Sequence, residues 1–521
     1  MLASRHVKKA NNTSKERIEH KIARYCFHGC LKKETLASGA SRWSMERDIY
    51  VIFWFDTEDY VTPEADDAAK RLAEILEENG VQGAFKIVGE KLRAIEKRDR
   101  QDVITALAKH EIGYHGEFHS MHPVISEYLG DLNWDEGVKE FERRERRGLD
   151  DIRRIFRVNP SCYGQPGGAW APQVYGALLE WEIPVYLDET AFIGLNERPF
   201  WYCGILNILN LGRNVVSVNF ELGTPGFLQE SCKRFKDICE RLKGEGGGVV
   251  SIFNHPCTLV TEEFWDGVNF SNGRNPSGGL IKPRMKTRDA IEDGYKDFHD
   301  FVRYVVSFPG VKVITAREAL DIYPDISVGK VLTVEGILKI LASFRESERI
   351  TFYADGEIAL SPAEILWLAV SCLSVYATES RIPEGVRVRR ILGPSEVFHN
   401  HDGPRQVSWD DFAKSCILVA GFIEEAGRIP SKIDLGRSAI SPESYLKTAI
   451  EVLFSITQGK RAPSSIEVQE GVLDTIKYVS EEGARDAWKW VIFPEGFNAP
   501  KLVHLAKLQA WTLKPALQRR T

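Results

Sequence analysis

The chain has 521 residues, of which 43% are hydrophobic and 27% are charged, and its formal net charge is −6. This length exceeds one ordinary hydrophobic core and predicts two or three domains. The mild negative charge gives no reason to expect nucleic acid as a partner. The nine cysteines lack the regular spacing of a small disulfide-bonded domain, which favours a reducing compartment.

The first 47 residues are basic and lack the apolar segment of a secretory signal peptide, so we expect an extension with little fold of its own. Cys26, His28 and Cys30 lie there, but a closed zinc site would need further ligands, and none is evident nearby. No run of about 18 apolar residues occurs in the chain. The sequence therefore predicts no transmembrane helix and a cytoplasmic protein.

Short apolar runs alternate with amphipathic stretches between residues 48 and 325, which is typical of a parallel α/β sheet. Seven or so units fit a closed barrel better than an open sheet, although the pattern alone leaves closure open. The predicted strands are 50–55, 83–88, 111–116, 183–189, 215–220, 247–253 and 311–315. The predicted helices are 64–78, 135–156, 172–181, 228–242 and 287–306.

A loop is predicted at 265–286, because this segment is rich in glycine, asparagine and proline. Two roles stay open for it. It could be a lid over the site or a contact between subunits of a homo-oligomer.

The remaining residues, 326–521, predict a mainly helical accessory domain. It contains three degenerate repeats, 361–383, 408–430 and 441–463, and each begins with a serine followed closely by an acidic residue. This is the N-capping chemistry of a helix start. Each repeat continues as an apolar-periodic helix and ends on Arg-x-Pro, and the last two run on into short extended segments. Repeated units of this size usually stack to bury a shared core.

Three carboxylates, Asp56, Glu58 and Asp59, follow the first predicted strand in the sequence FDTEDY. A single Asp at the end of a strand is more often a cap or a loop residue than a functional group. Three together must bind a cation, share protons or find basic partners. The carboxyl ends of the strands form the functional face of a β/α barrel, so this cluster is a candidate site.

Histidines gather after the third predicted strand in the sequence HGEFHSMHP. On a helix or a helical turn, His115 and His119 would lie on one face. Two imidazoles at this spacing commonly hold a divalent metal, and a carboxylate would complete a site with positions open for water and substrate. His255 ends a late strand in FNHPC, where it could act as a general acid or contact an oxyanion.

The motifs FDTED, HGEFH, GQPGG and FNHP occur in the order found in the polysaccharide deacetylase (NodB-homology) family, carbohydrate esterase family 4. Residues 48–325 resemble that family. The resemblance implies a distorted (β/α)7 barrel, a divalent metal that is often zinc, and hydrolysis of an N-acetyl group or a related amide. It also implies that Asp56 is the general base, that His115 and His119 bind the metal, and that His255 is the general acid.

Two departures from the family pattern affect the site. The second acidic residue of the family motif matches Glu58 best, with Asp59 as the alternative third metal ligand. The arginine that orients the catalytic Asp in the family has no match, and Gln165 stands in its place. We therefore expect Gln165 to hold Asp56 through a hydrogen bond.

Three further residues are candidates for binding substrate. Trp170 in GQPGGAW could stack on a sugar ring, and Asp188 in YLDET occupies the place of the family's groove motif. His122 lies three positions beyond His119 and is the third candidate.

The sequence thus predicts metal-dependent hydrolysis of a carbon–nitrogen amide bond, with an N-acetylated sugar or polysaccharide as the first substrate hypothesis. An allantoinase- or imidase-like hydrolase of a small cyclic amide is a second hypothesis. A catalytically silent glycan-binding protein is a third. The helical tail weakly resembles pseudomurein-binding repeats through its G-R-x-P-x-x-I pattern, which would imply binding to a cell-wall-like glycan.

Overall fold

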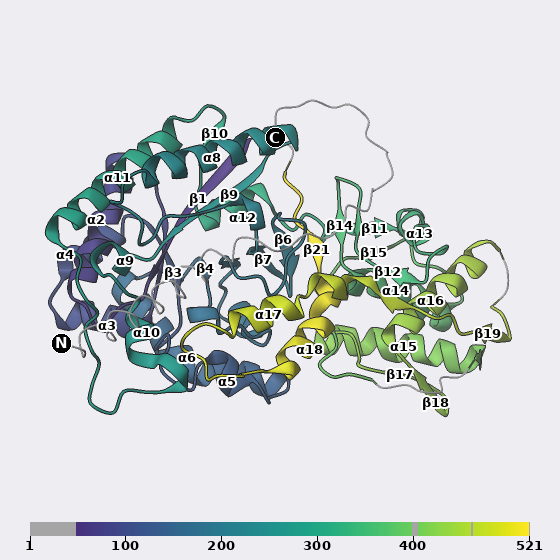
Figure 1. The fold of residues 1–521 in the computed structure, drawn as a ribbon. Helices are drawn as coiled ribbons and strands as arrows, with labels where there is room; N and C mark the ends of the chain where they lie inside the picture. Colours follow the sequence, from purple (N-terminus) through teal and green to yellow (C-terminus); the bar gives the residue numbers. More distant parts are fainter. Residues whose placement is uncertain (1–47, 399–404, 460–461, 520–521) are drawn as a thin grey trace, which may run out of the picture.

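The structure is a computed structural model that describes residues 48–398, 405–459 and 462–519. The predicted N-terminal extension, with Cys26, His28 and Cys30, lies outside the described residues. The chain forms a mixed α/β part built on one large sheet and a second, more helical part (Figure 1). Within the described ranges, each helix is too short or too polar to cross a membrane.

One curled sheet of eleven strands organises the first part. Eight of them run parallel in the order β7-β5-β4-β3-β2-β1-β9-β8. Their bounds are β1 Ile49–Thr57, β2 Ala84–Ile87, β3 Glu111–Tyr114, β4 Cys162–Tyr163, β5 Val185–Leu187, β7 Ile205–Ile208, β8 Val215–Ser217 and β9 Gly248–Asn254. β10 (Val311–Val313) also pairs with β1 in parallel, whereas β6 (Phe200–Tyr202) and β21 (Lys514–Pro515) extend one edge antiparallel. The predicted parallel α/β sheet is confirmed.

The central strand β1 shows why the sheet curls. All nine of its residues are buried, as expected of a parallel strand that is covered on both faces. Tyr50, Ile52 and Trp54 share an inner core with residues of β5, β7 and β9, although β5 and β7 lie several strands away in the sheet. Such a core requires a barrel-like curvature. In the described residues the ladder ends at β8 and at β21, so closure of a seven-unit barrel stays a prediction.

Helices cover the outer face of the curl (Figure 1). Their bounds are α2 Glu64–Glu78, α3 Gly89–Lys97, α4 Gln101–Leu107, α5 Ile125–Leu129, α6 Trp134–Phe156, α7 Val174–Glu180, α8 Phe227–Gly244, α9 Cys257–Val260, α10 Trp265–Phe270, α11 Arg288–Ser307 and α12 Ala316–Ile322. The predicted helices 64–78, 135–156, 228–242 and 287–306 match α2, α6, α8 and α11 to within two residues at each end. The side chains of Asn133 and Thr287 cap α6 and α11.

The second part contains four longer helices, α13 Val334–Ala342, α14 Pro362–Glu379, α15 Trp409–Ala426 and α16 Pro442–Thr457. Ser361, Ser408 and Ser441 each accept a hydrogen bond from the backbone N–H three residues on, so the predicted caps are confirmed. The short strands are β11 Val331–Thr333, β12 Arg349–Ile350, β13 Tyr353–Ala354, β14 Ala359–Leu360, β15 Gly385–Arg387, β16 Gln406–Ser408, β17 Ile433–Leu435, β18 Ser438–Ile440, β19 Ser465–Glu467 and β20 Val472–Leu473. The repeat architecture itself stays a prediction.

The end of the chain returns to the first part (Figure 1). The helices α17 (Glu481–Ala487) and α18 (Pro500–Gln509) lead to β21, which pairs with β6 of the large sheet. The buried Lys514 of β21 forms ion pairs with Asp325 at 2.9 Å and with Glu364 of α14 at 2.7 Å. These contacts connect both parts of the molecule, and the division of the chain at residue 325 stays a prediction.

Candidate functional site

Polar residues from distant parts of the sequence meet at the carboxyl ends of the parallel strands. Asp56 is the next-to-last residue of β1 and Glu58 follows that strand. His115, Asp188 and His255 directly follow β3, β5 and β9. Because these strands are parallel, the structure brings all five residues to one edge of the curled sheet.

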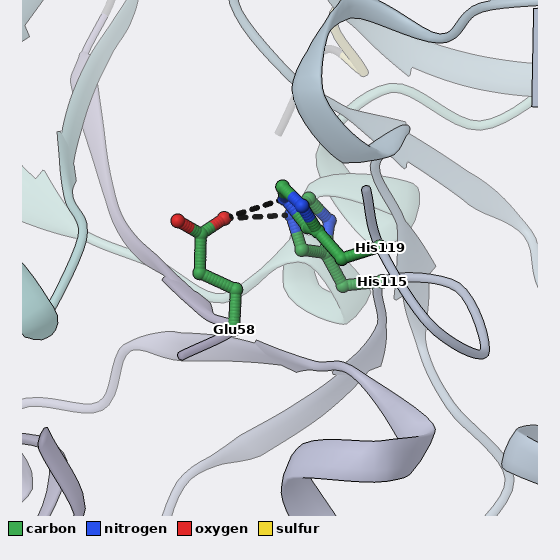
Figure 2. A group of neighbouring side chains, drawn as sticks. All are labelled: Glu58, His115 and His119. Carbon is green, nitrogen blue, oxygen red and sulfur yellow. Dashed lines mark ion pairs between the residues drawn. The ribbon is translucent and has the colours of Figure 1, made fainter. Parts of the chain in front are cut away.

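Glu58, His115 and His119 form a group that could hold a metal ion (Figure 2). One ligand atom of each lies within 4.8 Å of the others. The Oε2 atom of Glu58 is 2.7 Å from Nε2 of His119 and 3.6 Å from Nε2 of His115. The three side chains are at most 3% exposed. The site is therefore shielded from bulk water, and electrostatic interactions within it are stronger than they would be in water.

Hydrogen-bond contacts at Nδ1 fix the orientation of both rings. Nδ1 of His115 lies 2.9 Å from the carbonyl oxygen of Gly164, and Nδ1 of His119 lies 2.6 Å from Oγ of Ser120. A carbonyl can only accept, so Nδ1 of His115 donates and its Nε2 keeps a lone pair. Both Nε2 atoms are buried and face the carboxylate of Glu58. This donor set fits a divalent cation.

The histidines around Glu58 favour the ionised form of its carboxylate. Burial alone would raise the pKa of Glu58, but His119 and His255 lower it well below its usual range. Trp265, at the start of α10, donates its indole N–H to Oε1 of Glu58 at 3.0 Å and leaves Oε2 for the imidazoles. Sequence reasoning missed Trp265, because the six-residue helix α10 lies inside the segment predicted as a loop and is too short to show periodicity.

Asp59, the alternative third ligand, is turned away from the histidines. Its Oδ1 accepts hydrogen bonds from the backbone N–H groups of Val61 and Thr62, at 2.8 and 3.0 Å. It thus stabilises the turn before α2. Of the two acidic candidates, the structure joins Glu58 to the histidines.

The two histidines meet through a bent loop. Residues 115–118 are not helical, and His119 has φ of 58°, a left-handed conformation that is uncommon for residues other than glycine. The helical face that we expected from the four-residue spacing was wrong. The rings converge because the loop folds back at His119, and such strain is often found at functional sites.

Asp56 lies beside the candidate metal ligands, next to Lys86 and two histidines. Its Oδ1 is 2.9 Å from Nζ of Lys86 and 3.5 Å from Nδ1 of His115, and its Oδ2 is 3.6 Å from Nε2 of His255. Burial alone would raise the pKa of Asp56, but His115, Lys86 and His255 lower it below its usual value. Asp56 is therefore an ionised carboxylate.

Lys86 is a site residue that sequence reasoning missed. It stands opposite Asp56 in the register of β1 and β2, and it also lies 3.5 Å from Oδ2 of Asp188 and donates to the carbonyl of Leu187 at 2.8 Å. A Cβ at Gly164 would collide with Nζ of Lys86, so this glycine leaves room for the lysine. The available signal was a single cation within the apolar run GAFKIV.

Gln165 does not hold Asp56. Its Oε1 accepts from the hydroxyl of Tyr186 at 2.7 Å, and its Nε2 donates to Oγ1 of Thr190 at 2.6 Å. Our expectation of a neutral amide on Asp56 was wrong, because a cation from the neighbouring strand β2 reaches the carboxylate instead.

Trp170 was wrongly predicted as a platform for a sugar ring. It is 2% exposed and stacks on Phe192 with ring centroids 4.9 Å apart. Its ring is therefore part of the hydrophobic core and offers no face to a ligand.

His122 and Asp188 are engaged within the protein. Nδ1 of His122 lies 2.7 Å from Oε2 of Glu127, and its Nε2 lies 3.3 Å from the carbonyl oxygen of Phe270. Asp188 is paired with Lys86 and accepts hydrogen bonds from the next two backbone N–H groups. These contacts favour a role for both residues in holding neighbouring parts of the protein in place. Substrate binding by either residue stays a prediction.

Comparisons with known proteins do not assign the chain to a family. No protein-family model matches it, and no curated protein matches it. A Mycobacterium smegmatis protein assigned to the polysaccharide deacetylases aligns over 55% of this chain and 94% of its own, with 15% identity and a TM-score of 0.35. The Puue allantoinase aligns over 54% of this chain and 93% of its own, with 13% identity and a TM-score of 0.35. A 4-alpha-glucanotransferase from Thermococcus litoralis aligns over 58% of this chain and 46% of its own, with 15% identity and a TM-score of 0.36.

Similarity at this level establishes neither family nor function. The resemblance to deacetylases therefore stays a prediction, as does the weaker resemblance of the tail to pseudomurein-binding repeats.

Zn²⁺ binding distinguishes Glu58 from Asp59 as the third ligand. We expect Glu58→Gln to weaken the affinity by more than about 100-fold, since changes behind the ligands alone cost up to about that much. The matched change Asp59→Asn should bind Zn²⁺ as the wild type does. Isothermal titration calorimetry of the metal-free proteins measures both affinities. Weak binding by Asp59→Asn together with normal binding by Glu58→Gln would reverse the assignment.

A buried carboxyl group of α6 holds the loop that carries the histidines. Oε2 of Glu145 accepts from the backbone N–H of Glu117 at 2.6 Å, and the hydroxyls of Tyr114 and Tyr128 each donate to its carboxylate at 3.1 Å. Burial raises the pKa of Glu145 from 4.5 to about 7. Glu145 therefore binds a proton more tightly in the folded than in the unfolded protein, and its contribution to stability falls as the pH rises between these values.

A Glu145→Gln variant should lose this pH dependence of stability. Between about pH 5 and pH 8, we expect the wild type to lose roughly 3 kcal/mol of unfolding free energy relative to the variant. Urea denaturation at both pH values measures the difference. Asp150→Asn, which changes an exposed acid of the same helix, should behave as the wild type. The same pH dependence in Glu145→Gln and the wild type would show that the carboxyl is not perturbed.

Proposed function

We propose that the protein is a metal-dependent hydrolase of non-peptide carbon–nitrogen amide bonds, with N-acetylated sugars as its first substrate candidates. The proposal is supported by the proximity of the candidate metal ligands to the candidate base and acid. The candidate metal ligands Glu58, His115 and His119 lie beside a buried, ionised Asp56 that also faces His255. A bound divalent cation, with zinc as the first candidate, would supply a Lewis acid that polarises the amide carbonyl and acidifies water.

Asp56 is the general base in this proposal. Its carboxylate touches the metal-ligand His115 and is ionised, so it can accept a proton from water at the site. Lys86 fixes the carboxylate through the 2.9 Å ion pair. Burial alone would lower the pKa of Lys86, but Asp56 and Asp188 raise it above its usual value, so the lysine stays charged.

His255 is the general acid. Its side chain is 17% exposed, compared with 7% for Asp56, so His255 is the more solvent-accessible of the two. Asn219 holds the ring from behind, with its Oδ1 2.8 Å from the backbone nitrogen and 3.1 Å from Nδ1 of His255. Nε2 therefore faces the reaction centre and can give a proton to the departing amine.

A small cyclic amide is the second substrate candidate. The deep burial of the candidate metal ligands favours it, because a compact substrate reaches an enclosed site more readily than a polymer does. The same residue roles apply, since ring opening also breaks a carbon–nitrogen amide bond.

Substitution of the base and of the acid tests the proposal. We expect kcat to fall about 1,000-fold in Asp56→Asn and about 100-fold in His255→Gln, without loss of bound Zn²⁺. Acetate release from N-acetylglucosamine and ring opening of hydantoin, with Zn²⁺ and with a chelator, measure the activity. His299→Gln, which changes a histidine of α11 away from the site, is the control. A Zn²⁺-loaded wild type that hydrolyses neither probe would instead favour a catalytically silent glycan-binding protein.

A further inference from the structure

Residues 487–494, which we call the bridging segment, begin at the last residue of α17 and contact loops next to the candidate site from the far end of the sequence. The backbone N–H of Asn272 donates to the carbonyl of Val491 at 3.0 Å, and that of Gly273 donates to the carbonyl of Ile492 at 2.8 Å. These two hydrogen bonds attach the bridging segment to the chain just after α10, whose first residue holds the carboxylate of Glu58.

The bridging segment also contacts the turn after β4. A Cβ at Gly167 would lie 2.9 Å from Cδ1 of Ile492 and 3.6 Å from Cε1 of His119, so this glycine is held between the two side chains. A Cβ at Gly168 would lie 3.0 Å from the carbonyl oxygen of Ala487. The bridging segment therefore joins residues 167–168 to residues 272–273, which we call the two rim segments, and Gly167 lies beside the candidate metal ligand His119.

Trp490 extends this contact toward the candidate general acid. Its indole N–H donates to Oδ2 of the buried Asp266 at 2.9 Å, and its ring lies edge-on to Phe264 with centroids 5.7 Å apart. Phe264 in turn lies edge-on to His255 at 5.1 Å. A continuous aromatic contact thus runs from the bridging segment to His255.

We propose that the bridging segment is a wall of the site that restricts catalysis to compact amides, such as one N-acetylated sugar unit or a small cyclic amide. The inference rests on the proposed function. A polysaccharide extends on both sides of the reacting group and needs a site that is open in both directions. Here the His119 side is closed by the two joined rim segments, whereas His255 is the more exposed group. Substrate therefore enters from the His255 side, and a long chain has no exit past His119.

The test removes the wall and compares substrate lengths. In the Zn²⁺-loaded full chain, we measure kcat/KM for acetate release from N-acetylglucosamine and from its hexamer. The wild type should prefer the monomer. The double variant Trp490→Ala, Ile492→Ala should raise the hexamer-to-monomer ratio by about tenfold, the usual scale of discrimination by a side-chain contact. Lys489→Ala, which changes an exposed residue of the same segment, should leave the ratio unchanged.

A second measurement does not depend on the substrate. The chelator 4-(2-pyridylazo)resorcinol should remove Zn²⁺ about tenfold faster from the double variant than from the wild type or from Lys489→Ala, since the lost contacts open the site. The bound Zn²⁺ per chain and the circular dichroism of the double variant should match the wild type. If the double variant does not fold, Trp490→Phe with Ile492→Val should shift both readouts less but in the same direction.

Each outcome separates the wall from the proposed function. A folded double variant with an unchanged length ratio and an unchanged chelation rate would overturn the wall and leave the hydrolase intact. A wild type that prefers the hexamer to the monomer would also overturn the wall and leave the proposed hydrolase activity intact. If the wild type binds Zn²⁺ but hydrolyses neither the sugars nor hydantoin, the proposed function fails, and the chelation rate alone decides whether the bridging segment encloses the site.

Discussion

The ion pair between Asp56 and Lys86 is the interaction on which the arrangement of the site depends. Both side chains are buried, and each stands opposite the other in the register of two central strands. A buried charge without its partner typically costs about 3–5 kcal/mol, so this pair opposes any slip between the strands. A slip of one residue would turn Asp56 to the other face of the sheet and carry Glu58 away from the histidines. The pair thus couples the fold to the position of the candidate ligands.

The site is assembled in layers that come from progressively more distant parts of the chain. The innermost groups follow β1 and β3, and their strands are neighbours through β2. The next layer comes from Gly164 after β4 and from Trp265 of α10, which orient His115 and Glu58. The outermost layer is the bridging segment, which lies more than 200 residues beyond the loops that it joins. Each layer restricts the freedom of the one inside it, as a preorganised site requires.

Local patterns in the sequence were sufficient to predict the longer helices and several of their N-terminal caps. The helices α2, α6, α8 and α11 follow from apolar periodicity, and the serine caps of α14, α15 and α16 follow from capping chemistry. The grouping of a carboxylate with His115 and His119 was also anticipated, because a carboxylate after one parallel strand and two histidines after another must lie at the same edge. The preference for Glu58 over Asp59 came from the family resemblance.

The remaining features depend on contacts that no local pattern encodes. Lys86 acquires its role from strand register, and Trp170 is buried because Phe192 covers it. His122 is bound by a carbonyl group 148 residues further along the chain. The expected helical spacing of His115 and His119 failed because the same four-residue separation also fits a loop that folds back at a left-handed residue.

The central claim is that Glu58, His115 and His119 bind a divalent cation next to Asp56. Crystals of the Zn²⁺-loaded protein, measured on both sides of the zinc absorption edge, test it most directly. We predict an anomalous peak coordinated by Oε2 of Glu58 and by Nε2 of His115 and His119. A stoichiometric zinc ion bound by other residues, with no peak between these three side chains, would contradict the account.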